Sequence, residues 1–154
     1  QVPAQLPWMA PLPGAFRHNS DPLAVAGPGD HGRPTHNADI AFRNASGLPD
    51  SGMRTTARDM ATLGMALKRD FPGEFGYFSL RRFERNGHTV KGHNRALDMI
   101  AGADGIKTGF TRAAGFNLAT SVRQDGRALV AVVMGAESAR IRDVFMREGI
   151  GDRG

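Results

Sequence analysis

The feature that most constrains the fold is a run of six apolar residues, Leu129-Val130-Ala131-Val132-Val133-Met134. Its β-branched residues favour a strand, and a strand with no polar side needs cover on both faces. Residues 116–122 alternate apolar and polar side chains, which predicts a second strand with one buried face. Gln124-Asp125-Gly126 between them is typical of a turn, so we expect an antiparallel pair.

A helix is expected after Thr56, because Thr56-Ala57-Arg58-Asp59 fits a capping box. Pro72 should end this helix before it. Its apolar residues recur at the spacing of one helical face: Met60, Leu63, Leu67 and Phe71.

Two further elements complete the predicted order. Residues 77–92 are predicted to form a polar hairpin, with strands at 77–83 and 89–91 and a turn at Asn86-Gly87. A second amphipathic helix is expected from about Ser138, marked by Ile141, Val144 and Phe145. The predicted fold class is therefore α+β, an antiparallel sheet with helices packed on it.

Residues 1–38 have a different composition from the rest of the chain. They hold seven of the nine prolines, and the apolar residues among them keep no regular period. Proline lacks a backbone donor and blocks helix, so we expect an extended or disordered head. The predicted organisation is this head at 1–38, with Phe42 to Asp50 as an ordered loop at the start of a folded part, 39–154.

Composition excludes several functions. The chain has no Cys, which excludes disulfides and thiolate chemistry. The net charge of +5 comes mostly from Arg residues interspersed with acids, so we expect no specific nucleic-acid partner. Neither His31 and His36 nor His88 and His93 show metal-ligand spacing with a nearby carboxylate, so no metal or cofactor is expected.

The sequence shows no targeting or membrane segment. Residues 1–16 do not resemble a secretory signal, and no apolar run is long enough for a membrane helix. Since the chain opens on Gln1, its natural N-terminus need not be included.

The strongest candidate for chemistry is Lys107-Thr108-Gly109, at the start of the strand that precedes residues 116–122. At a sheet edge these residues would bind an extended peptide as an added strand. Lys107 would supply a positive charge for a carboxylate, Thr108 a hydroxyl to orient it, and Gly109 room for close backbone approach. The triplet alone is weak evidence, because a Lys on a solvated strand beside a turn glycine gives the same pattern.

The surrounding segments make the triplet more specific. In chain order they are residues 42–50 (Phe-Arg-Asn-Ala-Ser-Gly-Leu-Pro-Asp), 55–61 (Thr-Thr-Ala-Arg-Asp-Met-Ala), 93–97 (His-Asn-Arg-Ala-Leu), 104–111 (Asp-Gly-Ile-Lys-Thr-Gly-Phe-Thr) and 114–118 (Ala-Gly-Phe-Asn-Leu). Over about residues 40–148 the chain resembles the low-molecular-mass penicillin-binding proteins. These are serine D-alanyl-D-alanine carboxypeptidases, which trim peptidoglycan stem peptides.

The resemblance implies a β-lactamase/transpeptidase-like fold, incomplete here, and an acyl-enzyme mechanism. In the family, the Ser of a Ser-x-x-Lys motif attacks the D-Ala-D-Ala amide, a Ser-x-Asn motif assists proton transfer, and β-lactams acylate the same Ser. The family's Lys-Thr-Gly strand binds the terminal carboxylate. This implies a catalytic role for Lys107, substrate binding by Lys107, Thr108 and Gly109, and a place in the periplasm or on the outer face of the cytoplasmic membrane.

The other two motifs are absent from the 154 residues. No Ser has a Lys three positions on, and no Ser-x-Asn occurs. Ser51-Gly52-Met53-Arg54 is nearest, but Arg stays protonated and cannot act as a base. We therefore expect a truncated chain, a fragment or a head translated out of frame, inactive on its own. The alternative is a non-catalytic peptide- or carboxylate-binding fragment.

The missing part also has a structural consequence. In the family, strands from before the absent motifs pair beside the last strand. Without them, residues 129–134 would present an apolar edge, which favours aggregation. The sequence thus predicts a marginally stable chain that self-associates through an exposed sheet edge.

Overall fold

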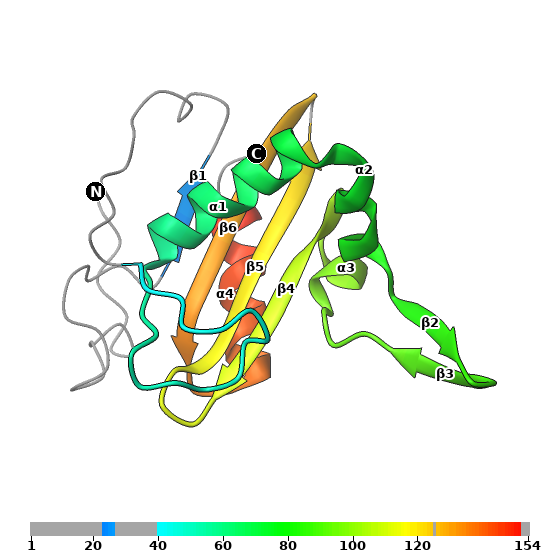
Figure 1. Ribbon diagram of the computed structural model, residues 1–154. Helices are drawn as coiled ribbons and strands as arrows, with labels where there is room; N and C mark the ends of the chain where they lie inside the picture. Colours follow the sequence, from blue (N-terminus) through cyan, green and yellow to red (C-terminus); the bar gives the residue numbers. More distant parts are fainter. Residues whose placement is uncertain (1–22, 27–39, 125, 152–154) are drawn as a thin grey trace, which may run out of the picture.

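The computed structural model describes residues 23–26, 40–124 and 126–151, and shows an antiparallel sheet with helices on both faces (Figure 1). The elements in chain order are β1 (Leu23–Ala26), α1 (Ala57–Asp70), α2 (Pro72–Phe75), the 3-10 helix η1 (Gly76–Ser79), β2 (Arg82–Arg85), β3 (His88–Lys91), α3 (Ala96–Met99), β4 (Ala103–Thr111), β5 (Gly115–Gln124), β6 (Arg127–Ala136) and α4 (Ala139–Gly151). The predicted α+β class is confirmed.

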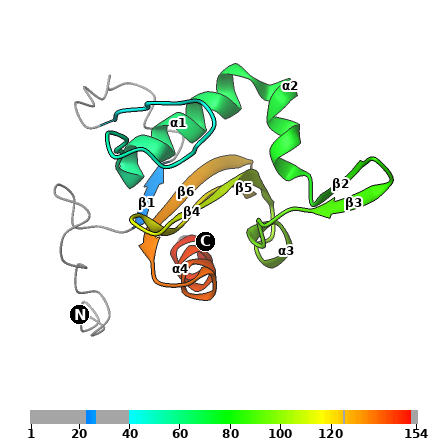
Figure 2. The ribbon, with the colours of Figure 1, turned by 60° about the horizontal axis from the view of Figure 1, so that its bottom comes forward.

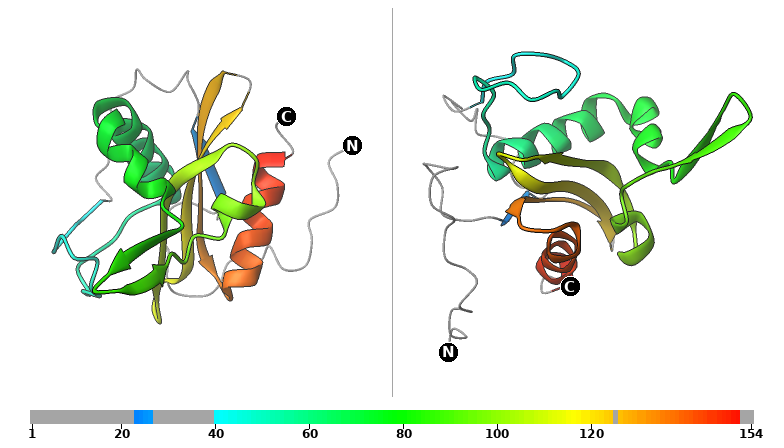
Figure 3. Two further views of the ribbon diagram at one scale, coloured as in Figure 1. Left: turned by 90° about the vertical axis from the view of Figure 1, so that its right-hand side faces the viewer. Right: turned by 90° about the horizontal axis from the view of Figure 1, so that it is seen from below.

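The main sheet has the strand order β1-β6-β5-β4, with every neighbouring pair antiparallel. Helix α1 covers one face and α4 covers the other, as Figure 3 shows from the side. The hairpin β2–β3 forms a separate two-stranded sheet and points away from these layers (Figure 2).

Strand β6 is buried on both faces, as its unbroken apolar run predicted. Ala131 and Val133 belong to a core cluster with Met146 of α4. Val130 and Val132 belong to a second cluster with residues of α1. Val130 is fully buried, and burying such a side chain stabilises the fold by about 1.5 kcal/mol or more.

Helix α1 begins as predicted, but its most deeply buried residues lie beside the predicted apolar face. The Asp59 amide donates to the Thr56 hydroxyl at 3.1 Å, and the helix ends before Pro72. Its buried residues include Ala57, Ala61 and Gly64. These small residues let the helix approach the sheet closely, and Met60 and Leu67 of the predicted face pack at the margin of this contact. Of that face, Met60 and Leu67 are half-buried, and Leu63 and Phe71 are exposed.

Two other predicted faces are wrong. Strand β5 is buried on both sides rather than one, because Ser121 is as inaccessible as Leu118 and Val122. The most deeply buried residues of helix α4 are Arg142, Asp143, Met146 and Ile150, and of the predicted residues Phe145 packs against the core. Ile141 is exposed, and Val144 and Phe145 are half-buried. Apolar residues at helical spacing predict a helix, but the layers that pack against it determine which of its faces is buried.

The predicted hairpin is present but shorter than expected. Residues Gly76–Ser79 form η1 instead of a strand, and pairing begins at Arg82. The turn at Asn86-Gly87 is confirmed, with φ of 51° and 74°. Both residues adopt the left-handed conformation that a two-residue hairpin loop requires.

The predicted apolar edge at residues 129–134 is also wrong. Strand β1 pairs with β6 from Leu23↔Val133 to Ala26↔Val130, so the middle of this edge has a hydrogen-bonded partner. That partner comes from within the proline-rich head, whose other residues lie outside the described part of the chain. Pairing of this kind removes the exposed edge on which the predicted self-association rested.

Replacing Gly64 with Ala tests the close packing of α1 on the sheet. An added Cβ would lie 2.8 Å from Ile106 Cδ1 and 2.9 Å from Val130 Cγ1. Ile106 can rotate away, but Val130 is β-branched and fully buried, so the helix or strand must shift. We expect Gly64→Ala to lower the free energy of unfolding by about 1–3 kcal/mol, despite the better helix propensity of Ala.

Urea denaturation followed by circular dichroism measures this change. Gly73→Ala is the matched control, because a Cβ there meets nothing within 4 Å. The control is expected to be neutral or slightly stabilising. Equal or higher stability of Gly64→Ala would contradict the close contact.

Candidate functional site

The predicted triplet lies on β4, a strand at the edge of the main sheet. Lys107, Thr108 and Gly109 of β4 pair with Ala119, Leu118 and Asn117 of β5, which confirms the predicted hairpin. Among the described residues, no strand pairs with the other side of β4. Its outer backbone groups are therefore available to an added strand.

Lys107 has an exposed side chain at this edge. Its Nζ donates to the Thr108 carbonyl at 2.6 Å and forms no ion pair with any described residue. Thr108 is half-buried. A Cβ on Gly109 would meet no atom within 4 Å, so packing within the chain does not require glycine there. The triplet thus presents a positive charge, a hydroxyl and an unobstructed backbone side by side.

A largely apolar groove of about 1210 Å³ adjoins the triplet. Its walls are α1, residues 41–56 and the sheet, and both Lys107 and Thr108 contribute to its lining. Met60, Leu63 and Leu67 of α1 line it too. Apolar walls lower the local dielectric constant and strengthen the attraction between Lys107 and an anion.

The wall formed by residues 41–56 is an ordered loop, as its Asn, Gly and Pro predicted. The Asn44 side chain accepts from the Gly47 amide at 2.9 Å and donates to the Leu48 carbonyl at 3.0 Å. Ala41 and Arg54 pair at the base of the loop. The sequence did not indicate that this loop and Lys107, more than 50 residues apart, line the same groove.

A partly buried polar cluster beneath the start of β4 was also missed. Lys68 Nζ of α1 lies 2.5 Å from Asp104 Oδ2 and 2.7 Å from Ser121 Oγ, and sits 4.8 Å from the centre of the Phe75 ring. Asp104 lies at a register shift in β4, three residues before Lys107. The ion pair ties the end of α1 to the strand that carries the triplet. Sequence spacing gave no sign of it, because the partners are 36 and 53 residues apart.

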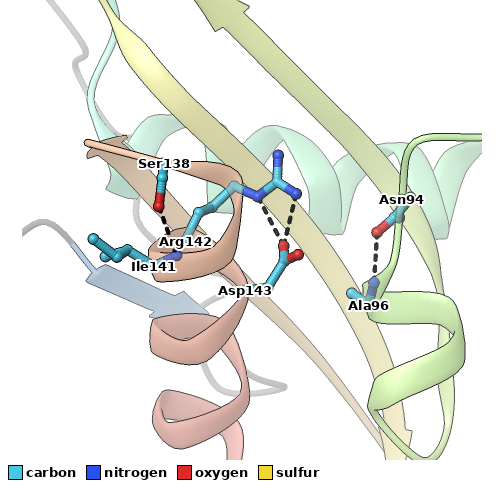
Figure 4. Close-up of polar contacts among 6 residues, drawn as sticks. All are labelled: Asn94, Ala96, Ser138, Ile141, Arg142 and Asp143. Atoms are coloured by element: carbon cyan, nitrogen blue, oxygen red, sulfur yellow. Dashed lines mark hydrogen bonds and ion pairs between the residues drawn. The ribbon is translucent and has the colours of Figure 1, made fainter.

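Two further buried charges lie on the α4 side of the sheet (Figure 4). Arg142 donates from Nε and one terminal nitrogen to Asp143 Oδ1, at 2.9 and 2.6 Å. Nearby, the Asn94 side chain accepts from the amide of Ala96, the first residue of α3, at 3.2 Å. Because each charge has its partner here, this cluster offers no free reactive group.

The remaining titratable residues add no second site. The pKa of Asp70 lies below its usual value because Arg69 hydrogen-bonds to its carboxylate, but both are exposed at the end of α1. His88 and His93 are exposed, and the described residues contain no cluster of three or more potential metal ligands. His31 and His36 lie outside the described residues. Within the described part, no helix combines the length and apolarity needed to cross a membrane.

The sequence profile of the D-alanyl-D-alanine carboxypeptidase family matches residues 35–138, which include the groove loop, α1 and the Lys107 triplet. The chain belongs to this family. The predicted resemblance is thereby confirmed.

Individual relatives agree with the family match. The chain is 41% identical over 102 residues to the D-alanyl-D-alanine carboxypeptidase DacC of Escherichia coli, a match that covers 66% of this chain and 26% of that protein. Penicillin binding protein 5 of Haemophilus influenzae superposes with a TM-score of 0.67 at 34% identity, over 71% of this chain and 32% of that structure. A penicillin-binding protein of Listeria monocytogenes, in its ampicillin-bound form, superposes with a TM-score of 0.64 at 28% identity, over 73% and 48%. The chain thus spans about a quarter of the length of the curated relative.

Replacing Lys68 with Met tests whether the ion pair holds β4 in place. Asp104 Oδ1 is already buried without a hydrogen bond, and Ser121 would lose its partner as well. We expect Lys68→Met to lower the free energy of unfolding by about 2–4 kcal/mol, because it leaves a partly buried carboxylate unpaired.

Lys91→Met is the matched control, because Lys91 is exposed on β3. Its effect should stay within about 0.5 kcal/mol. Both are measured by chemical denaturation. Indistinguishable unfolding midpoints for the two variants would show that Lys68 does not stabilise the strand.

Proposed function

We propose that this chain provides the carboxylate-binding part of a serine D-alanyl-D-alanine carboxypeptidase site. The observation that carries the proposal is the exposed Lys107 ammonium on the open edge of β4, beside an apolar groove. We assign this role to residues 39–154 as part of the catalytic domain, with β1 adding a strand from the head.

The substrate in this proposal is a peptidoglycan stem peptide that ends in D-Ala-D-Ala. It would lie along β4 as an added strand and hydrogen-bond to the outer backbone groups. Lys107 would pair with the terminal carboxylate, and the Thr108 hydroxyl would orient it. Open space beside Gly109 would let the peptide backbone approach the strand.

The reaction itself needs groups that these residues do not supply. In a serine acyl-enzyme mechanism a Ser Oγ attacks the amide carbonyl, the terminal D-Ala leaves with a proton, and water then hydrolyses the ester. The 154 residues contain neither Ser-x-x-Lys nor Ser-x-Asn. We therefore propose that the chain alone binds the carboxylate and does not acylate.

One Ser–Lys contact does occur in the structure, between Ser121 and Lys68. It does not meet the requirements of a nucleophile and its base. Ser121 is completely buried, so a peptide carbonyl cannot reach it. Lys68 Nζ is already held by the Asp104 carboxylate at 2.5 Å, so a second contact occupies the nitrogen beside Ser121.

The proposed role implies a cellular location for the protein and a second class of ligand. Substrates of this class lie in the periplasm or on the outer face of the cytoplasmic membrane, where we place the protein. β-Lactams that carry a carboxylate are expected to share the Lys107 position in a complete site. Serine acyl transfer of this kind requires no metal or cofactor. The second candidate is a non-catalytic peptide- or carboxylate-binding fragment, favoured by the same open edge.

Labelling with a fluorescent penicillin separates catalysis from binding. We expect no band on a denaturing gel, because the sequence has no Ser-x-x-Lys and no Ser in the described part of the chain combines access with a neighbouring free base. An intact carboxypeptidase of the family serves as the positive control. A covalent adduct on this chain that survives denaturation would overturn the proposed lack of acylation.

Titration with a peptide ending in D-Ala-D-Ala tests the carboxylate site. We expect weak binding that Lys107→Gln reduces by about tenfold, since a charge-assisted hydrogen bond contributes roughly 1.5–3 kcal/mol. The affinity is measured by NMR chemical-shift perturbation. Lys91→Gln, which removes an exposed Lys of the hairpin, should leave it unchanged. The same peptide with an amidated C-terminus should bind as weakly as the variant; equal binding of both peptides would refute the role of Lys107.

A further inference from the structure

The hairpin β2–β3 stands apart from the proposed carboxylate site. It projects beyond the layers formed by the helices and the main sheet (Figures 1 and 2). Every residue of both strands is exposed on both faces. A two-stranded ribbon with no packed face is marginally stable in water, so its side chains are available to a partner.

Most of the chain's net charge is concentrated on this ribbon and its base. Residues 81–95 contain five Arg or Lys and one Glu, a net charge of +4, whereas the whole chain carries +5. Arg81 pairs with Asp98, and Glu84 accepts from Thr89. Arg82, Arg85 and Lys91 form no ion pair with any described residue. The ribbon is therefore a cationic projection on an otherwise nearly neutral molecule.

Apolar side chains gather at the same place. Five of the eleven exposed large hydrophobic residues in the described chain lie between residues 77 and 99: Tyr77, Leu80, Phe83, Val90 and Met99. The register pairs Phe83 with Val90 and Arg85 with His88. Since alternate residues of a strand share a face, these four side chains lie on one face of the ribbon. That face combines an aromatic and a branched apolar residue with Arg85 and His88 at the tip.

We propose that the β2–β3 hairpin docks the protein on an anionic phospholipid surface. Phe83 and Val90 would enter the headgroup layer, where aromatic side chains are favoured, and Arg85 of the same face would approach lipid phosphates. Arg82 and Lys91, on the other face of the thin ribbon, add to its attraction for the anionic surface. A hydrated polyanion such as nucleic acid offers the same charges but no apolar layer for Phe83. The shared apolar and cationic face therefore favours a lipid surface. The inference does not depend on the carboxylate site.

Vesicle co-sedimentation tests the docking surface directly. The whole chain is mixed with vesicles of phosphatidylglycerol and phosphatidylcholine in equal parts, or of phosphatidylcholine alone. We expect binding to the anionic vesicles only. High salt should weaken it without abolishing it, because salt screens the Arg and Lys contacts but not the burial of Phe83.

Two variants separate charge from apolar insertion. Changing Arg82, Arg85 and Lys91 to Gln should reduce vesicle affinity by about a hundredfold, since each basic residue near such a surface contributes about fivefold. Changing Phe83 to Ser should reduce it roughly tenfold and remove the part that survives high salt. The matched control changes Arg123, Arg127 and Arg147, which are exposed on the body of the protein, to Gln. This control loses the same charge and should bind as the parent does.

Fluorescence of a Trp at position 83 reports insertion into the vesicle without removing the aromatic side chain from the ribbon. In a Trp8→Phe, Phe83→Trp variant, we expect the emission to shift to the blue on adding anionic vesicles and to stay unchanged with a DNA duplex. Three results would overturn the proposal: no sedimentation with anionic vesicles, equal weakening by the control variant, or salt-sensitive binding to vesicles and DNA alike that ignores Phe83. Each result would mean that the basic residues of the hairpin act through non-specific attraction or bind another polyanion.

Discussion

Burial of β6 on both faces is the constraint on which the other elements depend. A strand whose central residues are all apolar is stable in water only when one layer covers each side, and α1 and α4 provide these layers. Val130 faces the α1 cluster and Val133 faces the α4 cluster. Hydrogen bonding adds a second requirement, because β6 needs a neighbour on each edge. Strand β5 meets it on one side, and the short β1 on the other.

The close approach of α1 to β6 also shapes the candidate site. Ala61 and Gly64 leave no room between helix and sheet, so the larger side chains of α1 lie to one side of the contact. There Met60 and Leu67 line the groove beside Lys107. At the end of the same helix, Lys68 holds Asp104 at the start of β4. One helix thus forms the apolar wall of the site and fixes the strand that carries its charge.

Membership of the carboxypeptidase family does not by itself supply the groups that the reaction needs. The segments that match the carboxypeptidase family include the groove loop, α1 and the Lys107 strand, all of which line the groove. Attack on an amide needs an accessible nucleophile with a free base beside it. The Ser121–Lys68 contact brings the right residue types together in the wrong environment, because Ser121 is buried and Lys68 is paired. Distance alone therefore does not identify an acyl-transfer site; access to the serine and the other contacts of the lysine decide.

The sequence by itself determined the features that depend on neighbouring residues. The capped start of α1 at Thr56, the turn at Asn86-Gly87, the two-sided burial of β6 and the Lys107 edge each follow from local patterns of propensity and polarity. The sequence also identified the family, through several short segments in a fixed order.

Only the tertiary structure decided which face each helix buries, because packing distance favoured Gly64 over Leu63 and placed Arg142 inward. It alone paired β1 with β6 and Lys68 with Asp104. These contacts join residues far apart in the chain, and their energy depends on burial and geometry that no local pattern records.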